Sequence, residues 1–524
     1  MRTYNVALKE GIDYDTFWDE METDGIGGIH IPERAVDIIN ERPTSLRQCW
    51  YELSDSEADL LKQDPRVYCV EIPPEYRDDI EIAPSATQTG LYYKVSGVNP
   101  ANNLGINWGL FRLSSTTDNT PSTSGTLNYD YTLDGTGVDF VLTDSGCQID
   151  HPEFTDANGD TRVNQINWFT ASGVSGTMPA FNVFYTDNDG HGTHCTGIAA
   201  GKTYGRAKNS RIYVMSIAGL AVSPTVGISP TDAFDCIKGW HRNKPVDPAT
   251  GYKRPTVVNM SWSYINTFTS ITGGVYRGTP WTGTTRQTAY GMIGNGAGRW
   301  GVRVGSVDID VAELLAEGVI LVGSAGNYFQ TIDTPGGLDY DNYFNQTGGG
   351  QQYYMRGGSP TSTEGVICVG NIDTTYATGT VEQKNTSSES GPRVDVWAPG
   401  TSIVSTTSNT NIYGATAAYP FNSSYRIMSI TGTSMASPNI AGIVAQMLQQ
   451  NPGATPAQIR QAIIDASTPN VLYTTGLTTD YSNSRSLHGG PNRYGYLALT
   501  APVTTSISLT GSVILSGPLS ITYI

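Results

Sequence analysis

The stretch TGTSMASP at residues 431–438 leads into an apolar segment, Ile440 to Gln449, that we expect to be a helix. A serine that opens a helix is usually only its N-cap, because its hydroxyl accepts a hydrogen bond from the first turn. Three other blocks make this stretch informative. Each is a sharp turn that ends a buried strand or opens a helix, which is where open α/β sheets bind their ligands.

The other three blocks are VLTDSG (141–146), DGHGTHCTG (189–197) and GSAGN (323–327). Taken singly, each has an ordinary structural explanation: Asp144 suits an Asx turn, His191 a helix cap, and Asn327 a strand-to-turn residue. His191 and His194 could also bind a metal, but no Glu lies between them and no third ligand is apparent.

Continuous apolar runs separated by crossovers predict the surrounding sheet. Such runs are typical of parallel strands that are covered on both faces. We therefore expect an α/β, three-layer domain with a mostly parallel sheet over residues 106–500. Two segments rich in Gly, Thr and Tyr, 266–305 and 328–362, are expected to be surface insertions. The predicted strands are Val138–Thr143, Ile212–Ile217, Thr256–Met260, Val319–Gly323 and Val366–Val369.

Together the four blocks resemble, in chain order, the Asp, His, Asn and Ser blocks of the subtilisin-like serine proteases (the subtilase, peptidase S8, family). The resemblance covers about residues 105–500 and implies a serine endopeptidase that works through a catalytic triad and an acyl-enzyme intermediate. It implies that Ser434 is the nucleophile, His191 the general base and Asp144 the residue that holds the imidazole. Asn327 would donate to the oxyanion. No cofactor is then required for the chemistry.

Substrate binding follows from the same resemblance. A peptide would lie as an extended strand beside segment 261–263, with its side chains in pockets lined there and by segment 324–326. Trp262 is bulkier than the aliphatic residue usual in the family, and Ser263 replaces the usual Gly, so we expect a narrowed or re-shaped apolar subsite. The candidate substrate-binding residues are Ser261, Trp262, Ser263, Ser324, Ala325 and Gly326.

Cys195, directly after His194, is similar to the proteinase K branch, in which a free thiol lies under the catalytic His. The connection from Gly197 to Arg211 is short and lacks the longer loop with which subtilisins proper bind calcium. Residues 156–160 resemble the start of an EF-hand loop, but position twelve is Asn167 instead of Glu, so a turn is expected. No metal ligand is assigned, and a structural calcium ion is left open.

The first 80 residues predict a separate α+β, ferredoxin-like domain with strands and helices in β-α-β-α-β order. Ser54 and Glu57 form a capping box for its second helix. This domain resembles the inhibitory propeptide of subtilases, which implies an intramolecular inhibitor and autoprocessing between Pro73 and Gly105. Residues 81–105 are expected to be a linker strap, and residues 501–524 a short C-terminal β tail.

Length, charge and cysteine spacing limit which other functions the chain can have. The 524 residues predict two to four domains at roughly 150 residues each. Lys and Arg number 31 against 48 Asp and Glu, a net charge of −17, which argues against a nucleic-acid partner. The six cysteines contain no C-x-x-C pair, and no apolar run is long enough for a membrane span.

Localisation depends on the acidic N-terminus, which predicts no signal peptide. We expect protein or peptide substrates and an extracellular or virion-associated location in preference to the cytoplasm. The alternative hypothesis is a virion or surface attachment protein, part of a large assembly, that retains a subtilase fold as a scaffold.

Overall fold

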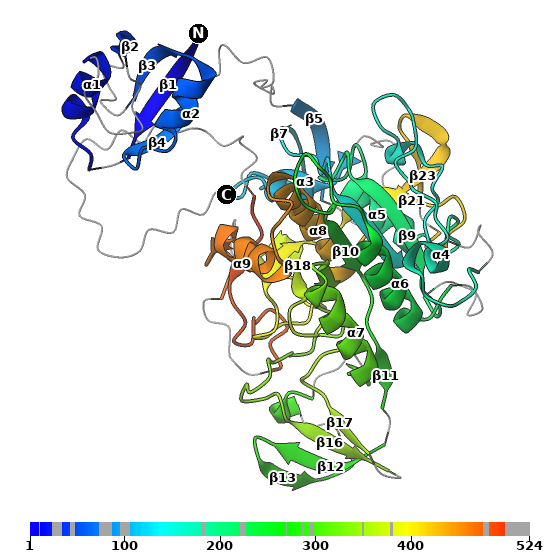
Figure 1. Cartoon of the computed structure of the whole chain (residues 1–524). Coiled ribbons are helices and arrows are strands. Elements are labelled where there is room, and N and C mark those ends of the chain that lie inside the picture. Colours follow the sequence, from blue (N-terminus) through cyan, green and yellow to red (C-terminus); the bar gives the residue numbers. More distant parts are fainter. Residues whose placement is uncertain are drawn as a thin grey trace. The chain divides into compact units, whose positions relative to one another are not determined.

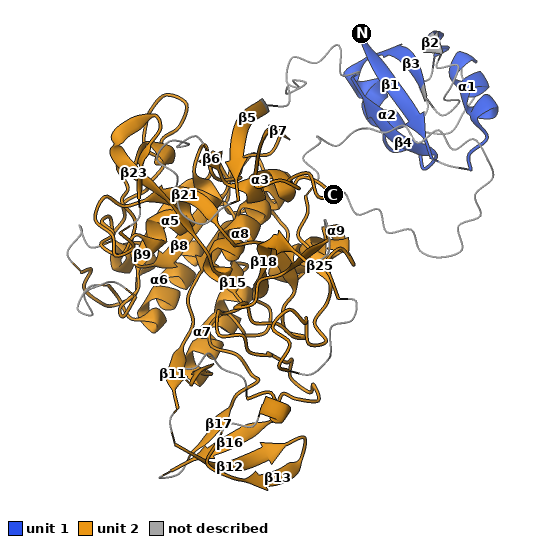
Figure 2. Ribbon diagram, turned by 180° about the vertical axis from the view of Figure 1, so that it is seen from behind, with its two compact units in different colours: residues 1–84 blue, residues 85–524 orange. Residues whose placement is uncertain are grey.

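The computed structural model divides into two compact units, Met1–Pro84 and Ser85–Ile524 (Figure 2). No helix among the described residues is long and apolar enough to cross a membrane. The structure describes residues 1–9, 11–23, 34–41, 48–72, 86–94, 105–179, 184–220, 227–268, 270–285, 288–292, 298–347, 350–377, 381–414, 416–474 and 481–497.

The N-terminal unit is a four-stranded antiparallel sheet with two helices. Its strand order is β2-β3-β1-β4, so Val6 on the central β1 faces Cys49 on one side and Val70 on the other. The predicted capping box forms, with Glu57 N–H donating to Ser54 Oγ at 3.2 Å. The sequence missed β2, whose four residues are too short for a clear alternation. The elements are β1 (Arg2–Leu8), α1 (Tyr14–Glu22), β2 (Ile38–Glu41), β3 (Gln48–Leu53), α2 (Asp55–Leu61) and β4 (Val67–Glu71).

The larger unit is built on a nine-stranded, mostly parallel sheet, which confirms the predicted α/β fold. The strand order is β24-β25-β20-β18-β15-β10-β8-β9, and β19 pairs with β18. Every residue of β8, β10 and β15 is buried, which requires cover on both faces of the sheet. The strands are β8 (Asp139–Asp144), β9 (Arg211–Ser216), β10 (Thr256–Met260), β15 (Ile320–Ser324), β18 (Ile367–Tyr376), β19 (Glu382–Lys384), β20 (Val396–Pro399), β24 (Thr468–Pro469) and β25 (Arg493–Tyr494).

Helices supply that cover (Figure 1). Helix α5 packs on α8, α8 also contacts the central strands, and α6 packs on α7 and α4. The predicted helix that follows TGTSMASP is α8, and it begins within that block. The helices of this unit are α3 (Trp108–Arg112), α4 (Trp168–Ser172), α5 (His191–Ala200), α6 (Pro230–Asn243), α7 (Gly305–Ala316), α8 (Thr433–Gln450) and α9 (Pro456–Ala466).

The linker prediction for residues 81–105 is wrong where the structure describes it. Strand β5 (Ala86–Tyr93) pairs antiparallel with β7 (Ser124–Tyr131) and parallel with β6 (Gly105–Ile106). Polar cross-strand pairs replace the apolar alternation that would have revealed this strand: Thr87 Oγ1 donates to Asp130 Oδ1 at 2.6 Å. The β tail predicted over residues 501–524 lies outside the described residues.

The two segments expected as separate surface insertions fold together. β12 from the first pairs with β16 from the second, and their aromatic side chains share one apolar cluster around Trp300 and Phe344. Figure 1 shows this lobe at the end of the unit beyond α7. Its strands are β11 (Ile265–Thr267), β12 (Ile271–Tyr276), β13 (Thr279–Thr282), β14 (Arg299–Gly301), β16 (Tyr343–Gln346) and β17 (Gln351–Tyr353).

A small antiparallel sheet lies beside α5. Its strands are in the order β21-β23-β22, and β21 packs directly on α5. Residues 408–414, which follow β21, are called the 408–414 loop below. The strands are β21 (Ile403–Thr407), β22 (Ala417–Tyr419) and β23 (Asn422–Ile430).

Candidate active site

The four sequence blocks meet at one edge of the parallel sheet. Asp144 is the last residue of β8, His191 the first of α5, Asn327 follows β15, and Ser434 is the second residue of α8. The carboxyl ends of parallel strands share an edge, so side chains far apart in the sequence come together there. All four line one cleft of about 290 Å³.

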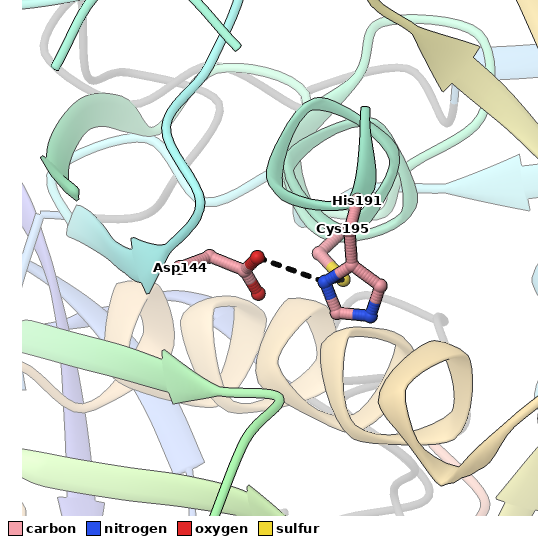
Figure 3. A group of neighbouring side chains, drawn as sticks. All are labelled: Asp144, His191 and Cys195. Atoms are coloured by element: carbon pink, nitrogen blue, oxygen red, sulfur yellow. Dashed lines mark hydrogen bonds and ion pairs between the residues drawn. The ribbon is translucent and has the colours of Figure 1, made fainter. Parts of the chain in front are cut away.

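Asp144 and His191 form the central contact of this cleft (Figure 3). His191 Nδ1 lies 2.8 Å from Asp144 Oδ1, and the carboxylate is only 2% exposed. Because Nδ1 carries the proton that Asp144 accepts, Nε2 of the neutral ring is left as the acceptor. Burial alone would lower the pKa of His191, but the charge and hydrogen bond of Asp144, together with the neighbouring Cys195, outweigh it and hold that pKa well above its ordinary value.

Asp187, which the sequence analysis missed, caps the helix that carries His191. The N-cap residue Gly190 has no side chain, and Asp187 accepts instead from the N–H groups of Gly190 and Thr193, both at 2.8 Å. Such a carboxylate satisfies the free amides of the first turn. The signal was available as an acidic residue four positions before His191 in DNDGHGTH.

Cys195 lies one helical turn beyond His191 and beneath its ring (Figure 3). Its Sγ is 3.8 Å from His191 Nδ1, and the thiol donates to the backbone carbonyl of Ser434 at 3.4 Å. Burial raises the pKa of Cys195, which keeps the thiol protonated.

His194 does not join His191 as a metal ligand. It is fully buried, and its Nε2 donates to the carbonyl oxygens of Ile403 at 3.1 Å and Met428 at 3.2 Å. Burial lowers the pKa of His194 to about 3, so the ring is a neutral packing residue. The EF-hand-like segment is a turn, as expected, because Asp156 accepts from the backbone N–H groups of Asn158 and Asp160.

Ser434 faces the cleft, but its hydroxyl donates to the carbonyl oxygen of Ser261 at 3.1 Å. Among the contacts described, none joins this hydroxyl to His191. Ser261 Oγ in turn donates to the carbonyl oxygen of Ser434 at 2.9 Å, which ties the start of α8 to the end of β10. The Ser434 hydroxyl must therefore leave the Ser261 carbonyl to donate to the imidazole, and catalytic hydrogen bonds often tighten only when substrate binds.

Asn327 is oriented by Thr433. Its Oδ1 accepts from the backbone N–H of Thr433 at 2.9 Å and from the Thr433 hydroxyl at 3.1 Å. With the oxygen end held in this way, the Nδ2 group of the amide is the end left to donate into the cleft.

Five of the six predicted substrate-binding residues line the cleft: Ser261, Trp262, Ser263, Ser324 and Gly326. Ala325 does not, because its side chain packs into the core of the sheet and its N–H donates to the carbonyl of Val369 at 2.9 Å. The ring of Trp262 stacks on Phe234 with 6.2 Å between centroids, so it backs the cleft more than it fills it. The sequence analysis missed the lining residues Ser145, Asp189, Leu220, Ile265, Tyr328 and Tyr413.

Comparison with known proteins finds a family model and several sequence relatives that are similar to this chain. A model described as the subtilase family matches residues 135–496. An extracellular serine proteinase of Thermus sp. (strain Rt41A) is 28% identical over 437 residues, 82% of this chain and 73% of that protein. A subtilisin-like serine protease of Penicillium citrinum is 26% identical over 396 residues, 73% of this chain and 65% of that protein.

A cuticle-degrading protease of Metarhizium anisopliae is 27% identical over 396 residues, 76% of this chain and 73% of that protein. The crystal structure of a cold adapted subtilisin-like serine proteinase aligns with a TM-score of 0.46 at 22% identity, and the alignment covers 76% of this chain and 99% of that one. The chain therefore spans about two thirds to three quarters of the length of these three sequence relatives.

Proposed function

The chain belongs to the subtilase family and is a subtilisin-like serine endopeptidase, and from this premise we propose that Asp144, His191 and Ser434 form its catalytic triad. The observation that carries the proposal is the 2.8 Å hydrogen bond between His191 Nδ1 and Asp144 at the mouth of the cleft that Ser434 also lines. The substrates are proteins or peptides, bound in that cleft.

The first half-reaction forms an acyl-enzyme. Ser434 Oγ attacks the scissile carbonyl carbon while its proton passes to His191 Nε2, and Asp144 stabilises the imidazolium that results. The same proton then goes to the leaving amine as the peptide C–N bond breaks. In the second half-reaction water attacks the ester, with His191 again taking and returning one proton, and Ser434 is regenerated.

Two donors would stabilise the negative oxygen of each tetrahedral intermediate: the backbone N–H of Ser434 and the Nδ2 group of Asn327. The hydrogen bonds from Thr433 to Asn327 support this role, because they fix the amide before the charge develops and no reorganisation is then needed.

The N-terminal unit is proposed as an intramolecular inhibitor that is released by self-cleavage. Its β-α-β-β-α-β order supports a compact domain able to fold on its own, with its own apolar core. Because residues 86–93 pair with β7 along their whole length, we place the cut between Pro73 and Ala86, on the N-terminal side of β5.

An attachment role on a virion or cell surface is not favoured, since the relatives compared above are named as proteinases. An extracellular location is a proposal that rests on the name of the Thermus relative, an extracellular serine proteinase.

One experiment tests the triad and self-processing together. Wild-type protein and Ser434→Ala are purified, treated with a biotinylated fluorophosphonate, and examined by intact mass and casein hydrolysis. We expect wild type to be labelled and processed, and Ser434→Ala to remain one unlabelled chain with hydrolysis reduced at least about 10³-fold. Hydrolysis retained by Ser434→Ala would overturn the assignment of the nucleophile. An active wild type that stays uncut would overturn the inhibitor role alone.

A further inference from the structure

The wall of the cleft beside His191 contains a carboxylate that the catalytic steps do not use. Asp189 lies two residues before His191, and its side chain is partly buried at the cleft. Its Oδ1 accepts a weak hydrogen bond from the backbone N–H of His191 at 3.3 Å. Among the described residues, no Lys or Arg forms an ion pair with it, and none lines the cleft.

The backbone of Asp189 is fixed on both sides. Its N–H donates to the buried Asp187 at 3.2 Å, and its carbonyl accepts from the N–H of Ile412 at 3.1 Å. Together with the hydrogen bond from His191 N–H to Oδ1, these contacts place the Asp189 carboxylate at the cleft. Burial raises the pKa of Asp189, and the charge of the neighbouring His191 opposes this only in part.

Tyr413 adds an aromatic ring to the same wall. It belongs to the 408–414 loop, which the Ile412–Asp189 hydrogen bond ties to the start of α5. Asn411 packs against Gly190 and accepts from the N–H of Tyr413 at 3.1 Å, so the loop presents this residue to the cleft. The charged groups that act most strongly on its phenol are those of His191 and Asp189, as expected for neighbours.

We propose that Asp189 and Tyr413 form a subsite for a lysine or arginine side chain next to the scissile bond, so that the enzyme selects peptides with a basic residue there. The carboxylate supplies the counter-charge, and the ring supplies a face for the cation or its aliphatic stem. A glutamate at this position would meet an unscreened like charge. The inference rests on the proposed peptidase function and names its substrate class.

The test compares internally quenched peptides that differ at one residue, which is lysine, norleucine or glutamate, placed in turn at the positions on either side of the scissile bond. At one of these positions we expect kcat/KM of wild type for lysine to exceed that for norleucine about tenfold, with glutamate the poorest. Asp189→Asn should reduce this ratio to near one, and Asp189→Lys should reverse it in favour of glutamate.

Three further variants distinguish the effect of the local subsite on this ratio from the effect of the protein's overall charge of −17. Glu313→Gln removes the same charge from the exposed face of α7, outside the cleft, and should leave the ratio as in wild type. Tyr413→Leu, which removes the ring, should lower the ratio about two- to fivefold, whereas Tyr413→Phe, which keeps it, should preserve it.

Fluorophosphonate labelling of every variant reports a folded, reactive site independently of selectivity. If wild type is neither labelled nor cleaves any of the peptides, the proposed function fails. If wild type is labelled and cleaves them without preference for lysine, or if Asp189→Asn keeps the preference, the basic subsite is wrong while the peptidase stands.

Discussion

The two walls of the cleft are built in different ways. On the catalytic wall, Asp144 and Ser434 are buried. The carboxylate of Asp144 accepts from the backbone N–H of Ser145, and the carbonyl of Ser434 accepts from the hydroxyl of Ser261. On the wall beside His191, Asp189 and Tyr413 are partly exposed, and the hydrogen bond from Ile412 N–H to the Asp189 carbonyl joins their segments. The proposed chemistry thus depends on rigid strand ends and helix starts, and the proposed selectivity on loops that can vary without disturbing them.

The largest effect is expected from Asp144→Asn, which keeps the shape of the catalytic wall and removes its charge. A neutral amide carries no charge to stabilise the imidazolium. It also no longer holds the proton on His191 Nδ1, so the ring takes the tautomer in which Nε2 is protonated and cannot act as the base. We expect kcat to fall about 10⁴-fold with little change in KM. Steady-state kinetics on one peptide measure this, with thermal unfolding as the control for folding. A loss below tenfold would show that Asp144 is not the partner of the base.

Asn327→Ala should come next. Removing one oxyanion donor costs about 10²–10³-fold in kcat in such sites. Thr433→Val is the matched variant, because it removes the hydroxyl that orients Asn327 and leaves the amide itself in place. Its kcat should fall less than that of Asn327→Ala. Equal KM values in all three proteins would place both effects in the transition state, whereas a rise in KM alone would contradict the oxyanion role.

The sequence predicted the catalytic wall because each of its residues lies in a short block at a strand end or helix start. It could not predict the wall that Asp189 and Tyr413 form. Tyr413 reaches Asp189 only through the folding of the 408–414 loop onto α5, and the two residues are far apart in the chain. A pairing of this kind leaves no local pattern in composition or periodicity.

The errors elsewhere have similar causes. β5 was taken for a linker because threonine and glutamine make its cross-strand contacts, and β12 and β16 were not paired because they come from two insertions. Ala325 was placed in the cleft because the block around it was treated as a unit, whereas its side chain, directly after β15, packs into the core.

A smaller effect is expected from pH. The base must be neutral, and the pKa of His191 lies above its ordinary value of about 6.5, so kcat/KM should fall as pH drops through a value above about 6.5. In Asp144→Asn the acid limb of the residual activity should lie at lower pH, because burial then acts without the opposing carboxylate. Rates of fluorophosphonate labelling across pH give the acid limb of wild type and that of Asp144→Asn. A limb that stays in place would locate the titrating group elsewhere.

The smallest effect is expected at Cys195, which lies on the catalytic wall and has no role in the proposed mechanism. The thiol is fully buried and protonated, and Ser434 already supplies the attacking oxygen, so its loss removes packing and one weak hydrogen bond to the Ser434 carbonyl. Cys195→Val replaces it with a side chain of similar volume and should change stability by less than about 1.5 kcal/mol and kcat/KM by less than about threefold.

An organomercurial should inhibit wild type, because a metal on Sγ displaces the imidazole 3.8 Å away, and should spare Cys195→Val. If a folded Cys195→Val, with a normal unfolding transition, lost turnover as completely as Ser434→Ala, the thiol would be part of the catalytic machinery. The attacking atom on the catalytic wall would then be the sulfur of Cys195 in place of the oxygen of Ser434.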